Sequence, residues 1–181
     1  MEEGTKLVLT PKEILELFFN RKDVFAVQQK KGMYFPTKRP ITLDDIQEHL
    51  DGTKTLGAYC LTPDNMVSWA CNDLDGDDLP SLKMQGKLIY DSFNGFPRIF
   101  EFSGRRGYHV WIFFRPRVTA DYAQKLVKAR INRLGLGGHE VFPKQTELTE
   151  FRKYGNLVKL PCGIHNLTGK RSDIIEMEGI R

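Results

Sequence analysis

The chain has 181 residues, 40% of them hydrophobic, so we expect one domain over residues 1–181 that folds around its own core. Its 27 Lys and Arg against 23 Asp and Glu give a formal charge of +4, which favours anionic partners without the extreme bias of a histone-like tail. Three widely spaced cysteines argue against a disulfide framework and a zinc site. The chain also lacks a signal-like N-terminus and any apolar run of about 18 residues, so we expect a cytoplasmic protein with no membrane partner.

The N-terminal third predicts two helices separated by a strand. In "TPKEILELFFN", Thr10 is the expected N-cap, Pro11 takes the first helical position and the apolar residues form one stripe. A strand is expected at "VFAVQQ", followed by a loop from Gly32 to Pro40. The second helix is expected at "TLDDIQEHL", with Thr42 as its cap.

The remaining elements alternate between short strands and single helices. We expect strands at "TLGAYCLT" and "MVSWACNDLD", joined by the turn "PDN", and short late strands at "HEVF", "NLVKL" and "DIIEM". Helices are expected at "DLPSLKMQGKLIYDSF", where Gly86 weakens the pattern, and at "TADYAQKLVKARINRL". This mixture predicts an α+β sandwich of two layers rather than a doubly wound parallel sheet.

The segment "SGRRGYH" carries more chemistry than a turn requires. It lies between the strand-like runs "PRIFEF" and "VWIFF", so it predicts the turn of a β-hairpin. A turn needs only glycine or another residue that tolerates positive φ. Arg105, Arg106 and His109 are therefore available to hold a ligand.

The segment "ACNDLDGDDLP" places two carboxylates at the end of a strand. Alternation sends Asp73 and Asp75 to one face, about 6.5 to 7 Å apart at the backbone, so both can reach the same ions. An ordinary loop with a helix N-cap is the alternative. A calcium loop is excluded, because Asp78 and Met84 stand where it needs glycine and glutamate. Since "VSWACN" reads as a buried strand, carboxylates where it leaves the core must be solvated or hold cations.

A third segment, "GNLVKLPCGIHNLTGKRS", adds Lys159 in a strand and His165 after a turn. Each alone is typical of a solvated strand face or a polar loop. Together with the hairpin residues they form a set suited to a triphosphate beside metal-binding carboxylates. The members of this set are Ser103, Arg105, Arg106, His109, Lys159 and His165.

These motifs, in this order, resemble the catalytic subunit of the archaeo-eukaryotic primase superfamily. The resemblance covers roughly positions 70 to 172, and "SGRRGYHVW" is its most specific part. "HEVFPKQTEL" followed by "GNLVKLP" is more similar to the stand-alone primase-polymerases of bacterial mobile elements, conflict systems and CRISPR loci. The resemblance implies an N-terminal α/β unit packed on a unit similar to an RNA-recognition motif, with the active site between them.

The resemblance also implies roles for single residues. Asp73 and Asp75 correspond to the first metal-binding pair. The triphosphate contacts would be Ser103, Arg106 and His109, with Arg105 as a further basic contact and Lys159 and His165 as later ones.

The third metal ligand is less well defined, since families of this kind usually place an aspartate there. This chain offers Glu140 in "HEVF" and Glu147 in the following loop. We expect Glu140, because strands position ligands better than loops, while Glu147 is closer in spacing to "KLP" and remains the alternative. An all-oxygen site suits two Mg²⁺ or Mn²⁺ ions.

The implied activity is that of a DNA or RNA primase-polymerase, which adds nucleoside triphosphates to a 3′-hydroxyl on a single-stranded or primed template. Two alternatives stay open: a nucleotide-binding or sensor module without turnover, and a metal-dependent phosphoesterase. The intact acidic pair disfavours the first, and the triphosphate-binding set is surplus for the second. Because "EMEGIR" directly follows a predicted strand, we expect a catalytic core from a longer protein with further domains.

Overall fold

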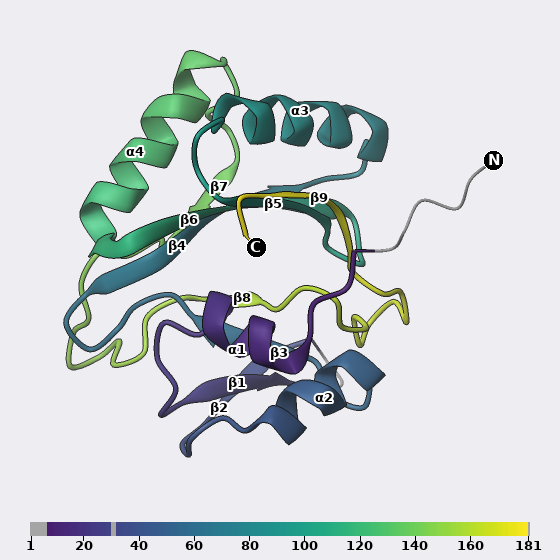
Figure 1. Ribbon diagram of the computed structural model, residues 1–181, viewed down its shortest axis with the longest axis vertical. Helices are drawn as coiled ribbons and strands as arrows, with labels where there is room; N and C mark the ends of the chain where they lie inside the picture. Colours follow the sequence, from purple (N-terminus) through teal and green to yellow (C-terminus); the bar gives the residue numbers. More distant parts are fainter. Residues whose placement is uncertain (1–6, 30–31, 181) are drawn as a thin grey trace.

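Two antiparallel β-sheets with four helices make up the computed structural model, which describes residues 7–29 and 32–180 (Figure 1). The five-stranded sheet has the order β7-β4-β6-β5-β9, and the four-stranded sheet has the order β2-β1-β3-β8. The strands of the larger sheet are β4 (Met66–Asp75), β5 (Arg98–Phe102), β6 (Gly107–Thr119), β7 (Glu140–Phe142) and β9 (Asp173–Glu178). Those of the smaller sheet are β1 (Phe25–Gln28), β2 (Tyr34–Thr37), β3 (Leu56–Tyr59) and β8 (Leu157–Lys159).

The helices divide between the two sheets. Figure 1 shows α3 and α4 covering the outer side of the larger sheet, while α1 and α2 lie beside the smaller sheet. Their bounds are α1 (Pro11–Phe18), α2 (Leu43–Asp51), α3 (Leu79–Ser92) and α4 (Ala120–Arg133). Within the described residues, no helix has the length and apolar character that a membrane crossing needs.

All four predicted helices are confirmed, and their starts are encoded locally. Thr10 and Thr42 each form a capping box, in which the hydroxyl accepts a backbone N–H three residues on and the acid at that position binds back. These reciprocal bonds satisfy amide groups that a helix start leaves unpaired.

The larger sheet confirms the predicted hairpin and shows its topology. β4, α3, β5, β6, α4 and β7 follow one another as βαββαβ, and β4 and β6 lie centrally in the sheet. This is the arrangement of ferredoxin-like and RNA-recognition-motif folds. The α+β class, with an N-terminal α/β unit packed on such a unit, is therefore confirmed.

One expectation about this part of the chain was wrong. The predicted loop from Gly32 to Pro40 contains β2, which pairs with β1 from Phe25↔Thr37 to Gln28↔Tyr34. β2 is an edge strand, where Pro36 costs no ladder hydrogen bond. The predicted turn "PDN" is confirmed by the hydrogen bond from the Asn65 N–H to the Thr62 carbonyl, and it joins β3 of the smaller sheet to β4 of the larger one. The chain crosses between layers there.

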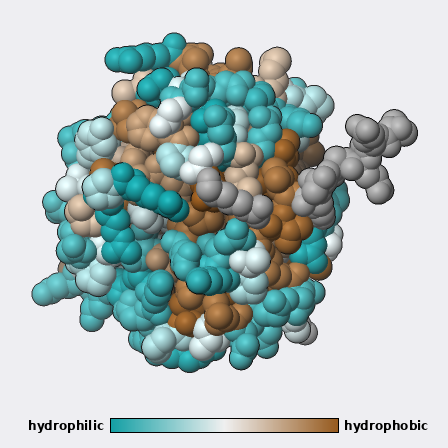
Figure 2. Space-filling model, viewed as in Figure 1, coloured by the Kyte–Doolittle hydropathy of each residue, from teal (hydrophilic) through white to brown (hydrophobic). Residues whose placement is uncertain are grey.

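Aromatic side chains fill the space between the layers. The rings of Trp69 and Trp111 lie 4.9 Å apart, and Phe18 of α1 lies 4.9 Å from Trp111. The Trp69 indole N–H donates to the carbonyl of Phe18 at 2.9 Å, so the buried polar atom is satisfied. In Figure 2, hydrophilic side chains cover most of this face and apolar ones gather toward its middle. The three cysteines are buried and free.

Candidate active site

A cleft of about 320 Å³ lies between the two sheets and collects most of the predicted site residues. Its lining includes Asp73, Asp75, Ser103, Arg105 and His109 from the larger sheet and its hairpin, with Gln28, Tyr34, Leu157, Lys159 and His165 opposite. An adjoining hollow of about 190 Å³ shares the two aspartates and adds Gly138, His139 and Glu140. A larger cavity of about 480 Å³, lined mostly by apolar residues, contains none of the predicted site residues, so we place the chemistry in the cleft.

The position of Asp73 follows from strand register. β4 lies between β6 and β7, and Asp73 pairs with His109 on one side and with Glu140 on the other. Burial raises the pKa of Asp73; His109 opposes that rise, whereas the charges of Asp75 and Glu140 add to it. Carboxylates that lie close together in a partly buried site repel one another, and a bound cation would reduce that repulsion.

Cationic side chains hold two of these carboxylates. The Arg106 guanidinium donates to both oxygens of Asp75, through Nε at 3.0 Å and Nη2 at 2.8 Å. Lys144 Nζ lies 2.7 Å from Glu140 Oε2. Arg106 thus binds an acid of the site and does not line the cleft, whereas Arg105 does.

The carboxylate oxygens of the site suit a hard divalent cation, although the side chains that carry them are not gathered around a common point. Among the described residues, no three His, Cys, Asp or Glu side chains stand close enough together to hold a metal ion. However, three carboxylates line the smaller hollow, and carboxylate oxygens suit Mg²⁺ and Mn²⁺. Asp73, Asp75 and Glu140 are the residues that could bind such ions.

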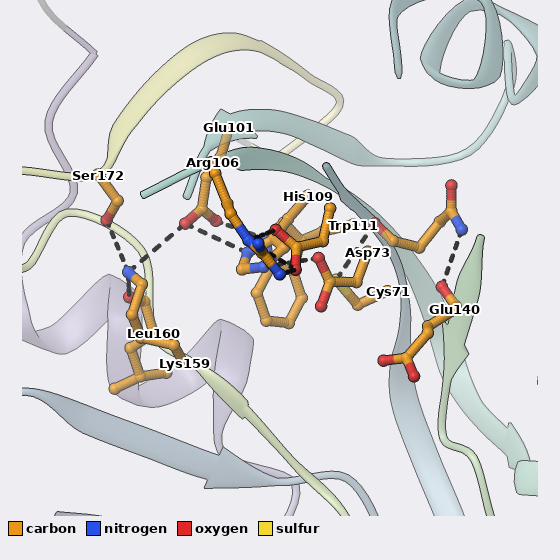
Figure 3. A network of polar contacts seen from close by, with 12 residues as sticks. Cys71, Asp73, Glu101, Arg106, His109, Trp111, Glu140, Lys159, Leu160 and Ser172 are labelled. Carbon is orange, nitrogen blue, oxygen red and sulfur yellow. Dashed lines mark hydrogen bonds and ion pairs between the residues drawn. The ribbon is translucent and has the colours of Figure 1, made fainter. Parts of the chain in front are cut away.

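His109 lies within β6 rather than at the hairpin turn, which corrects the expectation from the sequence. Its Nε2 is 3.6 Å from Asp73 Oδ1, and its Nδ1 is 3.4 Å from Glu101 Oε1 (Figure 3). Burial by itself lowers the pKa of His109, but the charges of Glu101 and Asp73 outweigh burial and raise the pKa overall. The ring is therefore more readily protonated than a free histidine, because it lies between two carboxylates.

Glu101 is the buried centre of this network, and sequence reasoning missed it. It has no exposed surface, and its Oε2 accepts the Trp111 indole N–H at 2.6 Å. Its Oε1 lies between His109 and Lys159, whose Nζ is 3.9 Å away. The available signal was alternation: in "PRIFEF", Glu101 shares a strand face with Ile99, whose side chain is in the core.

Lys159 is directed toward this network rather than into solvent. Its Nζ donates to the carbonyl of Leu160 at 2.8 Å and to Ser172 Oγ at 3.0 Å (Figure 3). Burial lowers the pKa of Lys159, and the charge of Glu101 opposes that change. The ammonium group is thus held at the floor of the cleft.

His165 closes the cleft on the side of the smaller sheet. Its Nδ1 accepts the backbone N–H of Leu167 at 3.2 Å, so the neutral ring carries its proton on Nε2. Burial, then the charges of Lys159 and Arg105, lower the pKa of His165. A neutral N–H donor beside two cations suits an anionic ligand.

The two candidates for the third acid separate in space. Glu140 lines the hollow that contains Asp73 and Asp75. Glu147 is exposed in the loop after β7, where its backbone carbonyl accepts from Gln145, and its side chain lines neither the cleft nor the hollow.

Comparison with known families agrees with this arrangement. Residues 36–180 match the family described as "TOTE conflict system, Archaeo-Eukaryotic Primase domain". The chain belongs to this family. The resemblance to the archaeo-eukaryotic primase superfamily inferred from the motifs is therefore confirmed. No curated protein matches the chain.

Two solved structures are similar to the chain. The archaeo-eukaryotic primase domain of the primase-polymerase from cyanophage S-2L matches with a TM-score of 0.61 at 15% identity, over 94% of this chain and 90% of that chain. The polymerase domain of ligase D from Mycobacterium tuberculosis, in complex with DNA, matches with a TM-score of 0.45 at 14% identity, over 91% and 72%. At this identity, the cyanophage likeness shows that the two chains share a primase-polymerase core fold.

Proposed function

We propose that this primase-family chain transfers a nucleotidyl group from a nucleoside triphosphate to the 3′-hydroxyl of a strand paired with a template. The observation that supports this proposal most directly is the register of β7, β4 and β6, which aligns Glu140, Asp73 and His109 across the larger sheet. Lys159 and His165 line the opposite side of the same cleft. Acids beside cations and hydrogen-bond donors in one cleft suit a triphosphate with its divalent ions.

The acidic side of the cleft would hold the metal. Asp73, Asp75 and Glu140 would supply the oxygens, and Arg106 and Lys144 pair with two of these acids. When bound, two divalent ions lower the pKa of the attacking hydroxyl and stabilise charge on the departing phosphates.

The basic side would bind the phosphates. Arg105 and Ser103 line the cleft at the hairpin turn, and His165 offers a ring N–H from the facing loop. In the reaction, a bond forms between the 3′-oxygen and the α-phosphorus, while the bond from the α-phosphorus to pyrophosphate breaks. Charge-assisted hydrogen bonds from these groups would hold the triphosphate in line for that displacement.

One observation favours a second candidate, nucleotide binding without turnover. Asp75 and Glu140 are each paired with a cation of the chain, so side chains of the protein can balance the charge of these two acids. Such a module would bind a triphosphate through the basic side alone.

Primer extension with labelled nucleotides, in Mg²⁺ and in Mn²⁺, tests the proposal. We expect the parent to extend a primed template, and Asp73→Asn and Glu140→Gln to lose extension by at least about 100-fold. Glu147→Gln is the matched control, because this glutamate is exposed and lies outside the hollow. A parent that binds triphosphates but never extends would support the second candidate, and full extension by Asp73→Asn would refute the metal assignment.

A further inference from the structure

Phe151 is the most exposed large apolar side chain among the described residues, with 97% of its surface accessible. It lies in the loop between β7 and β8, here called the Phe151 loop (residues 149–156). A phenylalanine held in water contributes nothing to the core, but a single exposed apolar residue is ordinary on a protein surface. What surrounds Phe151 therefore decides whether the loop is a binding site.

The backbone holds Phe151 in a defined turn. The N–H of Arg152 donates to the Thr149 carbonyl at 3.0 Å, which closes a four-residue turn with Phe151 in its third position. The same N–H lies 3.1 Å from the Thr149 hydroxyl. The ring is thus presented to solvent by a hydrogen-bonded turn.

Two further aromatic residues lie near Phe151: Tyr154, which is partly exposed, and Tyr59, which is buried. The Phe151 loop borders a pocket of about 440 Å³, whose lining includes Tyr59 and Tyr154. The Tyr59 and Tyr154 ring centroids are 5.4 Å apart, and the Arg21 guanidinium lies 5.3 Å from the centre of the Tyr154 ring. Such a pocket is large enough to admit a planar aromatic group.

Two cations follow Phe151 in the chain. Arg152 and Lys153 are both exposed, and neither forms an ion pair with any residue in the described part of the chain. Glu150, on the other side of Phe151, offsets only part of their charge. Some exposed lysines elsewhere, such as Lys87 and Lys125, are paired with acids, whereas others, such as Lys83, are not paired with any described residue, so the position of Arg152 and Lys153 beside an aromatic ring is what distinguishes them. Unpaired cations beside exposed aromatic rings are typical of single-stranded nucleic-acid surfaces.

This surface is continuous with the catalytic cleft. Tyr59 of β3 and Leu157 of β8 are direct cross-strand partners, so their side chains lie side by side on one face. Leu157 lines the cleft, and Tyr59 lines the pocket of the Phe151 loop. A strand that leaves the cleft along β8 would reach Phe151 next.

We propose that the Phe151 loop binds the unpaired part of the template strand, with Phe151 stacking on a base and Arg152 and Lys153 contacting phosphates. The assignment of the strand as template rests on the proposed function, because a templated reaction requires a single strand next to the cleft. The contact itself is independent of the chemistry and can be measured without it.

The test is a titration with a labelled oligothymidylate of about 16 nucleotides, without nucleoside triphosphate or divalent ion. We expect Phe151→Ala to weaken binding about 5- to 150-fold, the range for losing one base stack. Lys153→Ala should reduce the slope of log K against log salt by about 0.7, the value for one phosphate contact on a single strand. A blunt duplex of the same length should bind with little dependence on Phe151.

Matched controls come from α3, on the outer side of the larger sheet (Figure 1). Met84 is 62% exposed and Lys83 is exposed beside it, so Met84→Ala and Lys83→Ala remove the same kinds of group from a distant helix. Losses equal to those of the controls would overturn the proposal. So would equal losses on single strand and duplex, because a base in a duplex is not free to stack on the ring.

A second variant gives a signal that does not depend on lost affinity. Trp69 and Trp111 have no exposed surface, so Phe151→Trp introduces an exposed indole with its own fluorescence. We expect oligothymidylate to quench that emission, and an unchanged spectrum at saturation would overturn the stacking contact. Primer extension is scored separately: quenching without extension would retain the strand contact and refute only the polymerase proposal.

Discussion

Glu101 and His109 form a buried pair beneath the cleft: Glu101 Oε1 lies 3.4 Å from His109 Nδ1, and the carboxylate has no exposed surface. Lys159 approaches the same oxygen from the other side at 3.9 Å. This one buried carboxylate is therefore the counter-charge of two cations that face the candidate site. Removing it would leave both cations without their counter-charge.

We therefore expect Glu101→Gln to lower the free energy of unfolding by about 3 to 5 kcal/mol, as is typical when one partner of a buried ion pair is removed. The amide oxygen can still accept from Trp111, so the loss would report the charge rather than that hydrogen bond. Urea denaturation measures it. Glu176→Gln is the control, since Glu176 forms a partly exposed pair with Lys87 and should cost less than about 1 kcal/mol. Equal losses in both variants would contradict this account.

His49 predicts how stability depends on pH. Its ring is buried, accepting from the Leu56 N–H at Nδ1 and donating from Nε2 to the Pro161 carbonyl. Burial, then the charge of Lys159, lowers its pKa to about 4. The unfolded chain, with a histidine pKa near 6.5, binds more protons between these values, so stability is complete above that range and falls as pH drops through it.

The expected loss from His49 is about 3 kcal/mol between pH 7 and pH 4. Chemical denaturation across this range, on the parent and on His49→Gln, measures it, and the variant should show a shallower decline. The pKa of His139 and that of His165 are also lowered, so part of the decline should remain. A variant with the slope of the parent would contradict the assignment.

Gly86 in α3 should resist substitution although alanine is the better helix former. A Cβ at this position would lie 2.6 Å from Phe100 Cε2, because the helix packs closely on β5. We expect Gly86→Ala to lower the free energy of unfolding by about 1 to 3 kcal/mol, the usual cost of overpacking. Gly138→Ala is the control, since a Cβ at that position would have nothing within 4 Å. A stabilised Gly86→Ala would show that the helix can shift away from Phe100.

The two hairpin arginines should differ in nucleotide binding. Arg105 lines the cleft, whereas Arg106 is engaged by Asp75. In a titration with labelled triphosphate and no metal, we expect Arg105→Ala to lose about 10- to 150-fold in affinity and Arg106→Ala to lose less. Both groups of the Arg106–Asp75 pair are half-exposed, so Arg106→Ala should change stability by less than about 1 kcal/mol. A larger loss for Arg106→Ala would reverse the assignment.

Local signals in the sequence were sufficient for the helices, the hairpin and the residue types of the site. Thr10 and Thr42 cap helices through hydrogen bonds to residues only three positions away. Such caps can be predicted from the residue types in a short segment of sequence. The motifs around Asp73 and His109 likewise predicted the family that the comparison confirms. The sequence did not predict β2, because Pro36 and its basic neighbours are typical of a loop. Only pairing with β1 makes this segment a strand.

Tertiary structure alone decided how those residues meet. The sequence left Glu140 and Glu147 as alternatives, and the pairing of β7 with β4 brings only Glu140 beside Asp73. Glu101 and Lys159 are far apart in the chain, and they meet because β5 and β8 belong to different sheets that face each other. A window of sequence encodes capping and alternation, since these act over a few residues. It does not encode which strands become neighbours, because that choice depends on burying the aromatic surface of both sheets at once.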